Sequence, residues 1–198
     1  MRQETASRSR SFWSRPAPAA LFALAAALIG SATALSLGRV LADRSLLSTG
    51  RAEWVWYSSR VPKPVPLRFY AAREFTLAGL PARATARVFV DRQHILYVNG
   101  QRGGAGTQRP GDPLAIYEIA RFLHPGANRI VIEAASPTGI GGILFSLDGG
   151  SPADELLVSD GRWRVDKDAA ALAGGAGYRP VVWGRPPQYP WGYPTGSW

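Results

Sequence analysis

The feature that most constrains the fold of this chain is a series of short segments rich in β-branched and aromatic residues, which turn residues separate at short intervals. One of them, HILYV (His94–Val98), runs directly into Asn99-Gly100. Asn-Gly in this setting is the strongest short-range signal for a tight β-hairpin, because both central residues of a type I′ turn need positive φ. The remaining segments predict strands at 67–77, 85–90, 114–119, 128–134, 142–148, 155–160 and 162–165. Short strands at this spacing predict a mainly β fold, a jelly roll or β-sandwich.

Composition supports this architecture and excludes several functions. The chain has 22 glycines and 16 prolines, which suit many turns, and no cysteine, which excludes disulfides and thiolate chemistry. The formal net charge is +9. Much of the excess flanks one hydrophobic segment, and the Gly/Pro-rich stretch GGAGTQRPGDP after the hairpin is expected to be a mobile loop. Because no dense Lys/Arg cluster lies on a predicted strand beyond GRWRVDK, we expect no nucleic-acid partner.

The hydrophobic segment at the N-terminus is typical of a membrane span. Ala19–Gly38 holds no charged residue over 20 positions, and a helix of that length matches a hydrocarbon core of about 30 Å. Phe12, Trp13 and Arg15 precede it and are expected at the lipid interface. A cleaved signal peptide is the alternative, because Ala32-Thr33-Ala34 forms an Ala-x-Ala site.

These patterns predict a domain order and a location. The positive-inside rule places the N-terminus in the cytoplasm and the following domain in the periplasm or outside the cell, on an inner-membrane anchor. The predicted parts are a basic cytoplasmic tail (1–18), a transmembrane signal anchor (19–38), a connector (39–51), a β-sandwich (52–177) and a tail rich in proline and aromatic residues (178–198).

An ordered set of motifs resembles a known domain family. ILYVNG, IYEIARFLHPGANRIVIEA, GGILFSL, LLVSDGRWRV and YRPVVWGRPPQYPWG follow one another between about Trp54 and Gly192. In that order they resemble the galactose-binding-like β-sandwich domains that accompany bacterial α-L-rhamnosidases and β-galactosidase-type glycoside hydrolases. The resemblance implies a sandwich in which LHPGAN closes a helical turn and its asparagine ties the loop. Gly103 departs from the pattern, which carries a valine-like residue there.

No catalytic or metal site is expected. The two histidines, His94 and His124, are too few for a three-histidine zinc site. Asp154 and Glu155 are adjacent and would point to opposite faces of a strand, so they do not form a glycosidase pair. The serines lack a nucleophile-elbow sequence. We therefore expect no enzyme and no cofactor, although domains of the resembled type can hold a structural calcium ion.

The expected function is an interaction role, with two alternatives. In the first, the protein is an accessory subunit that stabilises a larger bacterial membrane complex, of photosynthetic or respiratory type. In the second, it is a membrane-tethered carbohydrate-binding module for surface or extracellular glycans. The residues expected to contact a glycan or protein partner lie in the loop after the hairpin and in the tail: Arg102, Arg109, Tyr189, Trp191, Tyr193 and Trp198.

Overall fold

The computed structural model describes residues 26–36, 49–59, 63–150, 154–192 and 194. The chain divides into two units, Met1–Leu41 and Ala42–Trp198. In the first unit, residues 26–36 are helical. No helix within the described ranges is long and apolar enough to cross a membrane, so the expected span over 19–38 gains no support. Phe12, Trp13 and Arg15 lie outside the described residues.

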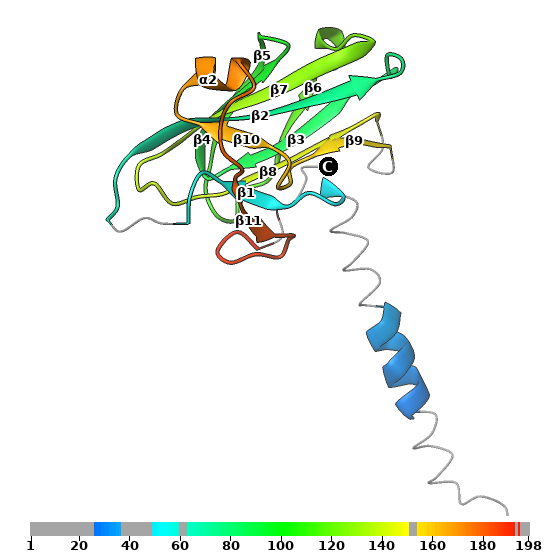
Figure 1. Ribbon diagram of the computed structural model, residues 1–198. Helices are drawn as coiled ribbons and strands as arrows, with labels where there is room; N and C mark the ends of the chain where they lie inside the picture. Colours follow the sequence, from blue (N-terminus) through cyan, green and yellow to red (C-terminus); the bar gives the residue numbers. More distant parts are fainter. Residues whose placement is uncertain (1–25, 37–48, 60–62, 151–153, 193, 195–198) are drawn as a thin grey trace, which may run out of the picture. The chain divides into compact units, whose positions relative to one another are not determined.

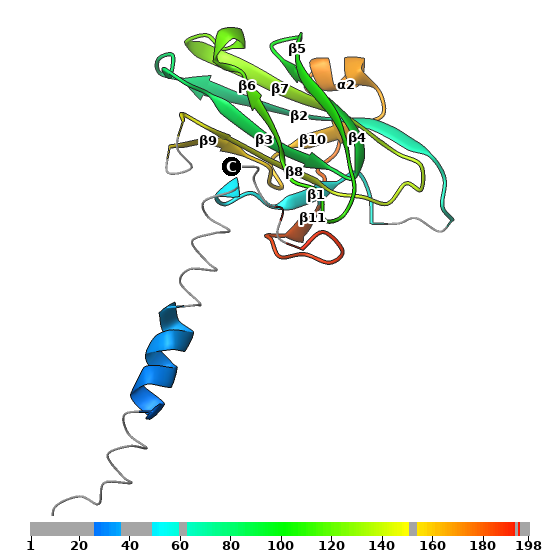
Figure 2. The ribbon, with the colours of Figure 1, turned by 180° about the vertical axis from the view of Figure 1, so that it is seen from behind.

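The second unit contains a sandwich of two antiparallel sheets, shown from opposite sides in Figures 1 and 2. The six-stranded sheet has the order β11-β1-β8-β3-β6, with β9 paired to β8, and the five-stranded sheet has the order β10-β2-β7-β4-β5. This confirms the predicted mainly β sandwich. The elements are β1 (Trp54–Trp56), β2 (Leu67–Leu77), β3 (Thr85–Val90), β4 (Arg92–Val98), β5 (Gln101–Gln108), β6 (Ala115–Glu118), η1 (Ala120–Phe122), β7 (Gly126–Ser136), β8 (Ile143–Asp148), β9 (Glu155–Val158), β10 (Arg164–Asp166), α2 (Ala169–Ala173) and β11 (Val181–Gly184).

The main core lies between the sheets, and in β7 of the five-stranded sheet it follows a two-residue period. In β7, Ile130, Ile132 and Ala134 are fully buried, while the residues between them are half-buried. Trp56 from the other sheet meets Phe69 of β2 edge to face, with ring centroids 4.9 Å apart. Because successive side chains point to opposite faces, this inward set fixes which residues reach the outer surface.

The β4–β5 hairpin forms at the predicted turn, but the segment after it is not a loop. Asn99 and Gly100 have φ values of 50° and 80°, as the turn requires. Residues 103–108 of the expected loop instead belong to strand β5 (Gln101–Gln108), so the prediction is wrong for them, while 109–113 lie outside any strand. A Cβ on Gly104 would collide with the ring of Tyr117. The glycines therefore let β5 pair closely beside an aromatic ring that crosses from the other sheet.

In the LHPGAN motif the asparagine ties the loop, as the resemblance to the family implied. Asn128 donates from Nδ2 to the carbonyls of His124 (2.6 Å) and Gly126 (3.0 Å), and its Oδ1 accepts from the His124 amide (3.1 Å). Asn99 of the hairpin also donates to that Oδ1, at 2.9 Å. One buried asparagine thus fixes the start of β7 against the β4–β5 turn.

The C-terminal segment wraps the sandwich. Its strand β11 pairs with β1 at the edge of the six-stranded sheet, so the fold continues beyond the boundary expected at residue 178. Further on, Trp191 stacks on Trp54 with ring centroids 4.6 Å apart. Helix α2 was not predicted, although Asp168 caps its first turn by accepting from the Ala170 amide at 2.8 Å.

Candidate functional site

The outer face of the five-stranded sheet brings polar and aromatic side chains together. The pairing places Tyr70 of β2 opposite Glu133 of β7, and Glu133 opposite Ile95 of β4. In the neighbouring row, Tyr97 of β4 lies opposite Val131. Two tyrosines therefore flank one glutamate on a surface that also carries Arg68 and Gln93.

Glu133 is the centre of this arrangement. Its side chain is only 13% exposed, yet it carries an ionisable group on an outer face. Arg68 Nη1 lies 3.1 Å from one carboxylate oxygen, and the Tyr97 hydroxyl donates to the other at 3.4 Å. Loss of water around Tyr97, together with the negative charge of Glu133, raises the pKa of the tyrosine. The tyrosine therefore stays a neutral donor at physiological pH.

Two adjoining depressions lie on this face, of about 650 Å³ and 350 Å³. Four residues line both of them: Arg68, Gln93, Thr107 and Ala135. The larger depression extends to Arg109 and the smaller one to Glu133. We name the two together the sheet groove. Its volume is in the range of small-ligand sites, and its lining combines charged and polar side chains with the short residues Ala105, Gly106 and Ala135.

The structure places the predicted contact residues in different settings. Arg109 lines the sheet groove, and Arg102 lies on the same outer face, opposite Tyr97 in the β4–β5 pairing. Tyr189 is 91% exposed. Trp191 is a correction, because it is 6% exposed and its Nε1 donates to Asp91 Oδ2 at 2.9 Å.

Two further predicted residues, Tyr193 and Trp198, lie outside the described part of the chain. Sequence reasoning missed Arg68, Tyr70 and Glu133 as site residues, and it placed Tyr97 on a strand without a role. The signal was present in LRFYAARE, where polar residues alternate with Phe69 and Ala71. The local sequence does not predict which strands pair with β2, and therefore does not predict which side chains become neighbours.

The described residues offer no evident centre for metal-dependent chemistry. Within those ranges, no group of three or more His, Asp or Glu side chains gathers as a metal site. His94 is 3% exposed and points inward, where its Nε2 lies 2.9 Å from the Tyr117 hydroxyl. It also borders the smaller depression, so it contributes both to the core and to the wall of the sheet groove.

Comparison with known proteins gives the fold its name. No protein-family model and no curated protein sequence matches this chain. Solved structures do match. An α-L-rhamnosidase of Streptomyces avermitilis, complexed with L-rhamnose, superposes with a TM-score of 0.64 at 18% identity, over 76% of this chain and 16% of the enzyme. A lectin from Pleurotus ostreatus in complex with GalNAc superposes with a TM-score of 0.62 at 21% identity, over 76% of this chain and 48% of the lectin. The domain has the galactose-binding-like β-sandwich fold.

These matches concern part of each relative. A family 78 rhamnosidase of Bacillus sp. GL1 also superposes, with a TM-score of 0.62 at 20% identity, over 72% of this chain and 19% of the enzyme. The chain spans less than a fifth of the two rhamnosidases and about half of the lectin. At these identities the likeness establishes the galactose-binding-like fold, and function has to be argued from the surface.

Proposed function

We propose that this protein is a carbohydrate-binding module without enzymatic activity, and that the sheet groove is its binding site. The observation that carries the proposal is the Arg68–Glu133–Tyr97 cluster, an ion pair and a hydrogen bond held on an open face beside a second tyrosine. The likeness of the fold to a lectin supports it. The same likeness to rhamnosidases is limited to a small part of each enzyme, as expected for an accessory domain.

The chemistry of a pyranose suits this surface. One side of the ring presents C–H groups, which pack on an aromatic face, and its edge presents hydroxyls, which both donate and accept hydrogen bonds. The ring of Tyr97 supplies aromatic area next to the groove. Arg68 and Gln93 offer donors, while Glu133 offers acceptor lone pairs fixed in position by their existing contacts. Preorganised polar groups of this kind lose little freedom on binding.

The location is proposed on the sequence alone. A signal anchor over 19–38 in the inner membrane would leave the sandwich tethered in the periplasm or outside the cell, where polysaccharides are found. The other expected role, an accessory subunit of a membrane complex, stays a prediction. No surface feature of the described residues favours it as the groove favours a glycan.

The test is saccharide binding by the full chain, measured by calorimetry and by retention on polysaccharide gels. The panel includes L-rhamnose, N-acetylgalactosamine, galactose and plant and bacterial polysaccharides. We expect Tyr97→Ala to weaken binding by about tenfold or more, because it removes both the aromatic area and the Glu133 contact. The matched control is Tyr178→Ala, which truncates an exposed tyrosine that does not line the groove.

The variants also separate the parts of the site. Tyr97→Phe keeps the ring and tests the hydroxyl alone, and Glu133→Gln removes the charge with little change of shape. Thermal unfolding of each variant shows whether the fold is retained. Absence of binding across the panel, or equal affinities for wild type and folded Tyr97→Ala, would refute the groove as a glycan site.

A further inference from the structure

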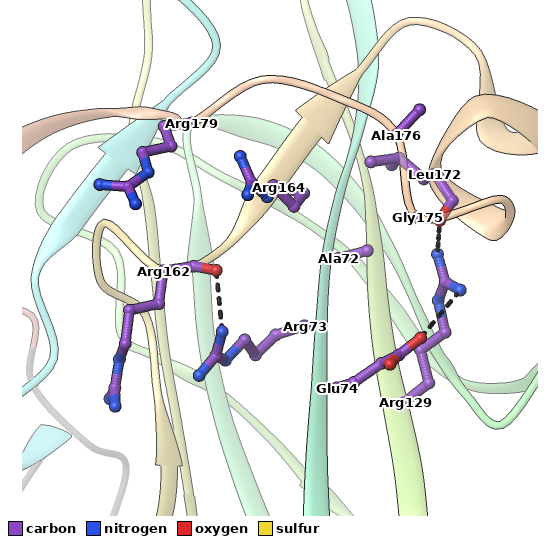
Figure 3. Close-up of a pocket in the computed structure, with 10 residues that line it drawn as sticks. All are labelled: Ala72, Arg73, Glu74, Arg129, Arg162, Arg164, Leu172, Gly175, Ala176 and Arg179. Atoms are coloured by element: carbon purple, nitrogen blue, oxygen red, sulfur yellow. Dashed lines mark hydrogen bonds and ion pairs between the residues drawn. The ribbon is translucent and has the colours of Figure 1, made fainter.

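A second cavity opens on the side of the same sheet where β10 pairs with β2, and arginines dominate its lining (Figure 3). Its volume is about 340 Å³. Helix α2 packs against β10 and β2 at this place, and the small residues Gly175 and Ala176 after the helix complete the rim. We name this cavity the arginine pocket. The lining arginines are Arg73, Arg129, Arg162, Arg164 and Arg179.

Two of these arginines are already neutralised. Arg129 lies 3.4 Å from the carboxylate of Glu74 and donates to the Leu172 carbonyl at 2.6 Å, which fixes the end of α2. Arg162 is paired with Asp160 at 2.6 Å. Among the described residues, Glu74 and Asp160 are the carboxylates within ion-pair distance of a pocket arginine, and each is already paired.

The other three arginines leave positive charge unbalanced. Arg73 donates to the Arg162 carbonyl at 2.9 Å, while its Nε is shielded from solvent with no partner among the described residues. Neither Arg164 nor Arg179 has a carboxylate within ion-pair distance in the part of the chain that the structure describes. Arg73, Arg164 and Arg179 all line this one cavity, as Figure 3 shows. Like charges gathered in this way repel unless an anion joins them.

The chemistry of the lining favours an oxyanion. A guanidinium presents N–H donors in a planar fork that matches carboxylate and sulfate oxygens, and such charge-assisted bonds are about twice as strong as neutral ones. Three guanidinium groups around one cavity supply more donors than a single oxyanion can use. The pocket is therefore suited to a charged group and not to a neutral hydroxyl.

The position of the pocket relates it to the sheet groove. Arg68 lines the groove and Ala72 lines the pocket, and both point outward from strand β2. Four residues of a strand span about 13 Å at roughly 3.3 Å per residue. Tyr70 lies between them on the same face. A saccharide chain lying along β2 would therefore contact both sites at once.

We propose that the ligand of this protein is an acidic polysaccharide, and that the arginine pocket binds its carboxylate or sulfate groups while neighbouring sugar units occupy the sheet groove. The proposal rests on the proposed carbohydrate-binding function and specifies its ligand class. It gives the unbalanced arginines a function that neutral-sugar binding leaves unexplained.

The test compares polymers that share a backbone and differ in charge. The full chain is titrated with polygalacturonate and its methyl ester, and with dextran sulfate and dextran, at two salt concentrations. We expect the charged member of one pair to bind about tenfold more tightly or better at near-physiological salt. The pair that shows the difference identifies the anion as carboxylate or sulfate.

Charge-matched variants separate a specific pocket from general attraction. Arg164→Gln/Arg179→Gln removes two charges from the pocket, and Arg83→Gln/Arg185→Gln removes two exposed charges elsewhere. We expect only the pocket variant to lose the preference for the charged polymer. Both arginines that it changes are exposed, so the fold is expected to persist, and thermal unfolding checks this.

The outcomes distinguish the two proposals. Equal binding of charged and uncharged polymers, or equal losses in the two double variants, would overturn the acidic ligand. Neutral saccharides would then still bind and the sheet groove would stand. Loss of all saccharide binding in Tyr97→Ala, together with a charge preference that depends on Arg164 and Arg179, supports both.

Discussion

The most informative stability prediction concerns a buried histidine in β4, between β7 and β5. His94 of β4 is 3% exposed and its Nε2 lies 2.9 Å from the Tyr117 hydroxyl of the other sheet. Its Nδ1 is buried with no hydrogen-bond partner among the described residues. Burial therefore disfavours the imidazolium form and lowers the pKa of His94 from 6.5 to about 4.

The sign and size of the effect follow from proton linkage. In the unfolded chain His94 titrates near its ordinary pKa, so below about pH 6.5 the unfolded state binds more protons than the folded state. The free energy of unfolding consequently falls as pH falls. With a folded pKa of about 4, the loss is about 2 kcal/mol at pH 5 and roughly 3 kcal/mol near pH 4. Above about pH 7 the effect is absent.

The assay is urea unfolding of wild type and His94→Gln between pH 7.5 and 5. The glutamine cannot titrate but retains a polar group near Tyr117. We expect the variant to be less stable at pH 7.5 and to lose about 2 kcal/mol less than wild type on going to pH 5. Thr76→Ala, at an exposed position that does not titrate, is the control and should keep the wild-type slope.

Two results would show this reasoning to be mistaken. One is a His94→Gln variant whose stability has the same pH dependence as that of wild type and of Thr76→Ala. The other is a proton NMR titration of the folded protein in which His94 titrates near 6.5. The NMR result is decisive even where the variant does not fold.

Three further predictions concern packing and can be checked by thermal and urea unfolding. Gly104→Ala should destabilise by about 1–3 kcal/mol because its Cβ meets the Tyr117 ring, whereas Gly79→Ala, where nothing lies within 4 Å, should change little; equal effects would contradict this. Trp191→Phe should destabilise by about 1–3 kcal/mol, since Asp91 loses a buried donor, and unchanged stability would refute a structural role for the tail. Asn128→Ala should cost about 2–4 kcal/mol, because two carbonyls and two donors lose their partner.

Local sequence patterns predicted much of the sandwich. The segments 67–77 and 85–90 match β2 and β3 residue for residue, because alternation of apolar and polar side chains reflects one buried face. The Asn99-Gly100 turn could also be predicted, because its positive φ values are required by the turn itself and not by distant parts of the fold. These features depend on short stretches of chain.

Predictions failed where a distant partner decides the structure. GGAG reads as a loop, because glycine is rare in strands, yet Tyr117 from another sheet makes glycine necessary in β5. Trp191 was expected to contact a glycan or protein partner, yet it stacks on Trp54 and donates to Asp91, both far away in the sequence. Neither partner can be identified from the residues nearby.

The sequence by itself determined that this domain is a β-sandwich and that Ala86, Val88 and Val90 share one face of β3, because side chains alternate along a strand. Only the tertiary structure decided which outward side chains become neighbours. Strand order places Arg68, Glu133 and Tyr97 together from three strands, and it brings Arg73, Arg164 and Arg179 to one pocket. Binding sites depend on such long-range neighbours, because a ligand touches several strands at once while each local pattern describes only one.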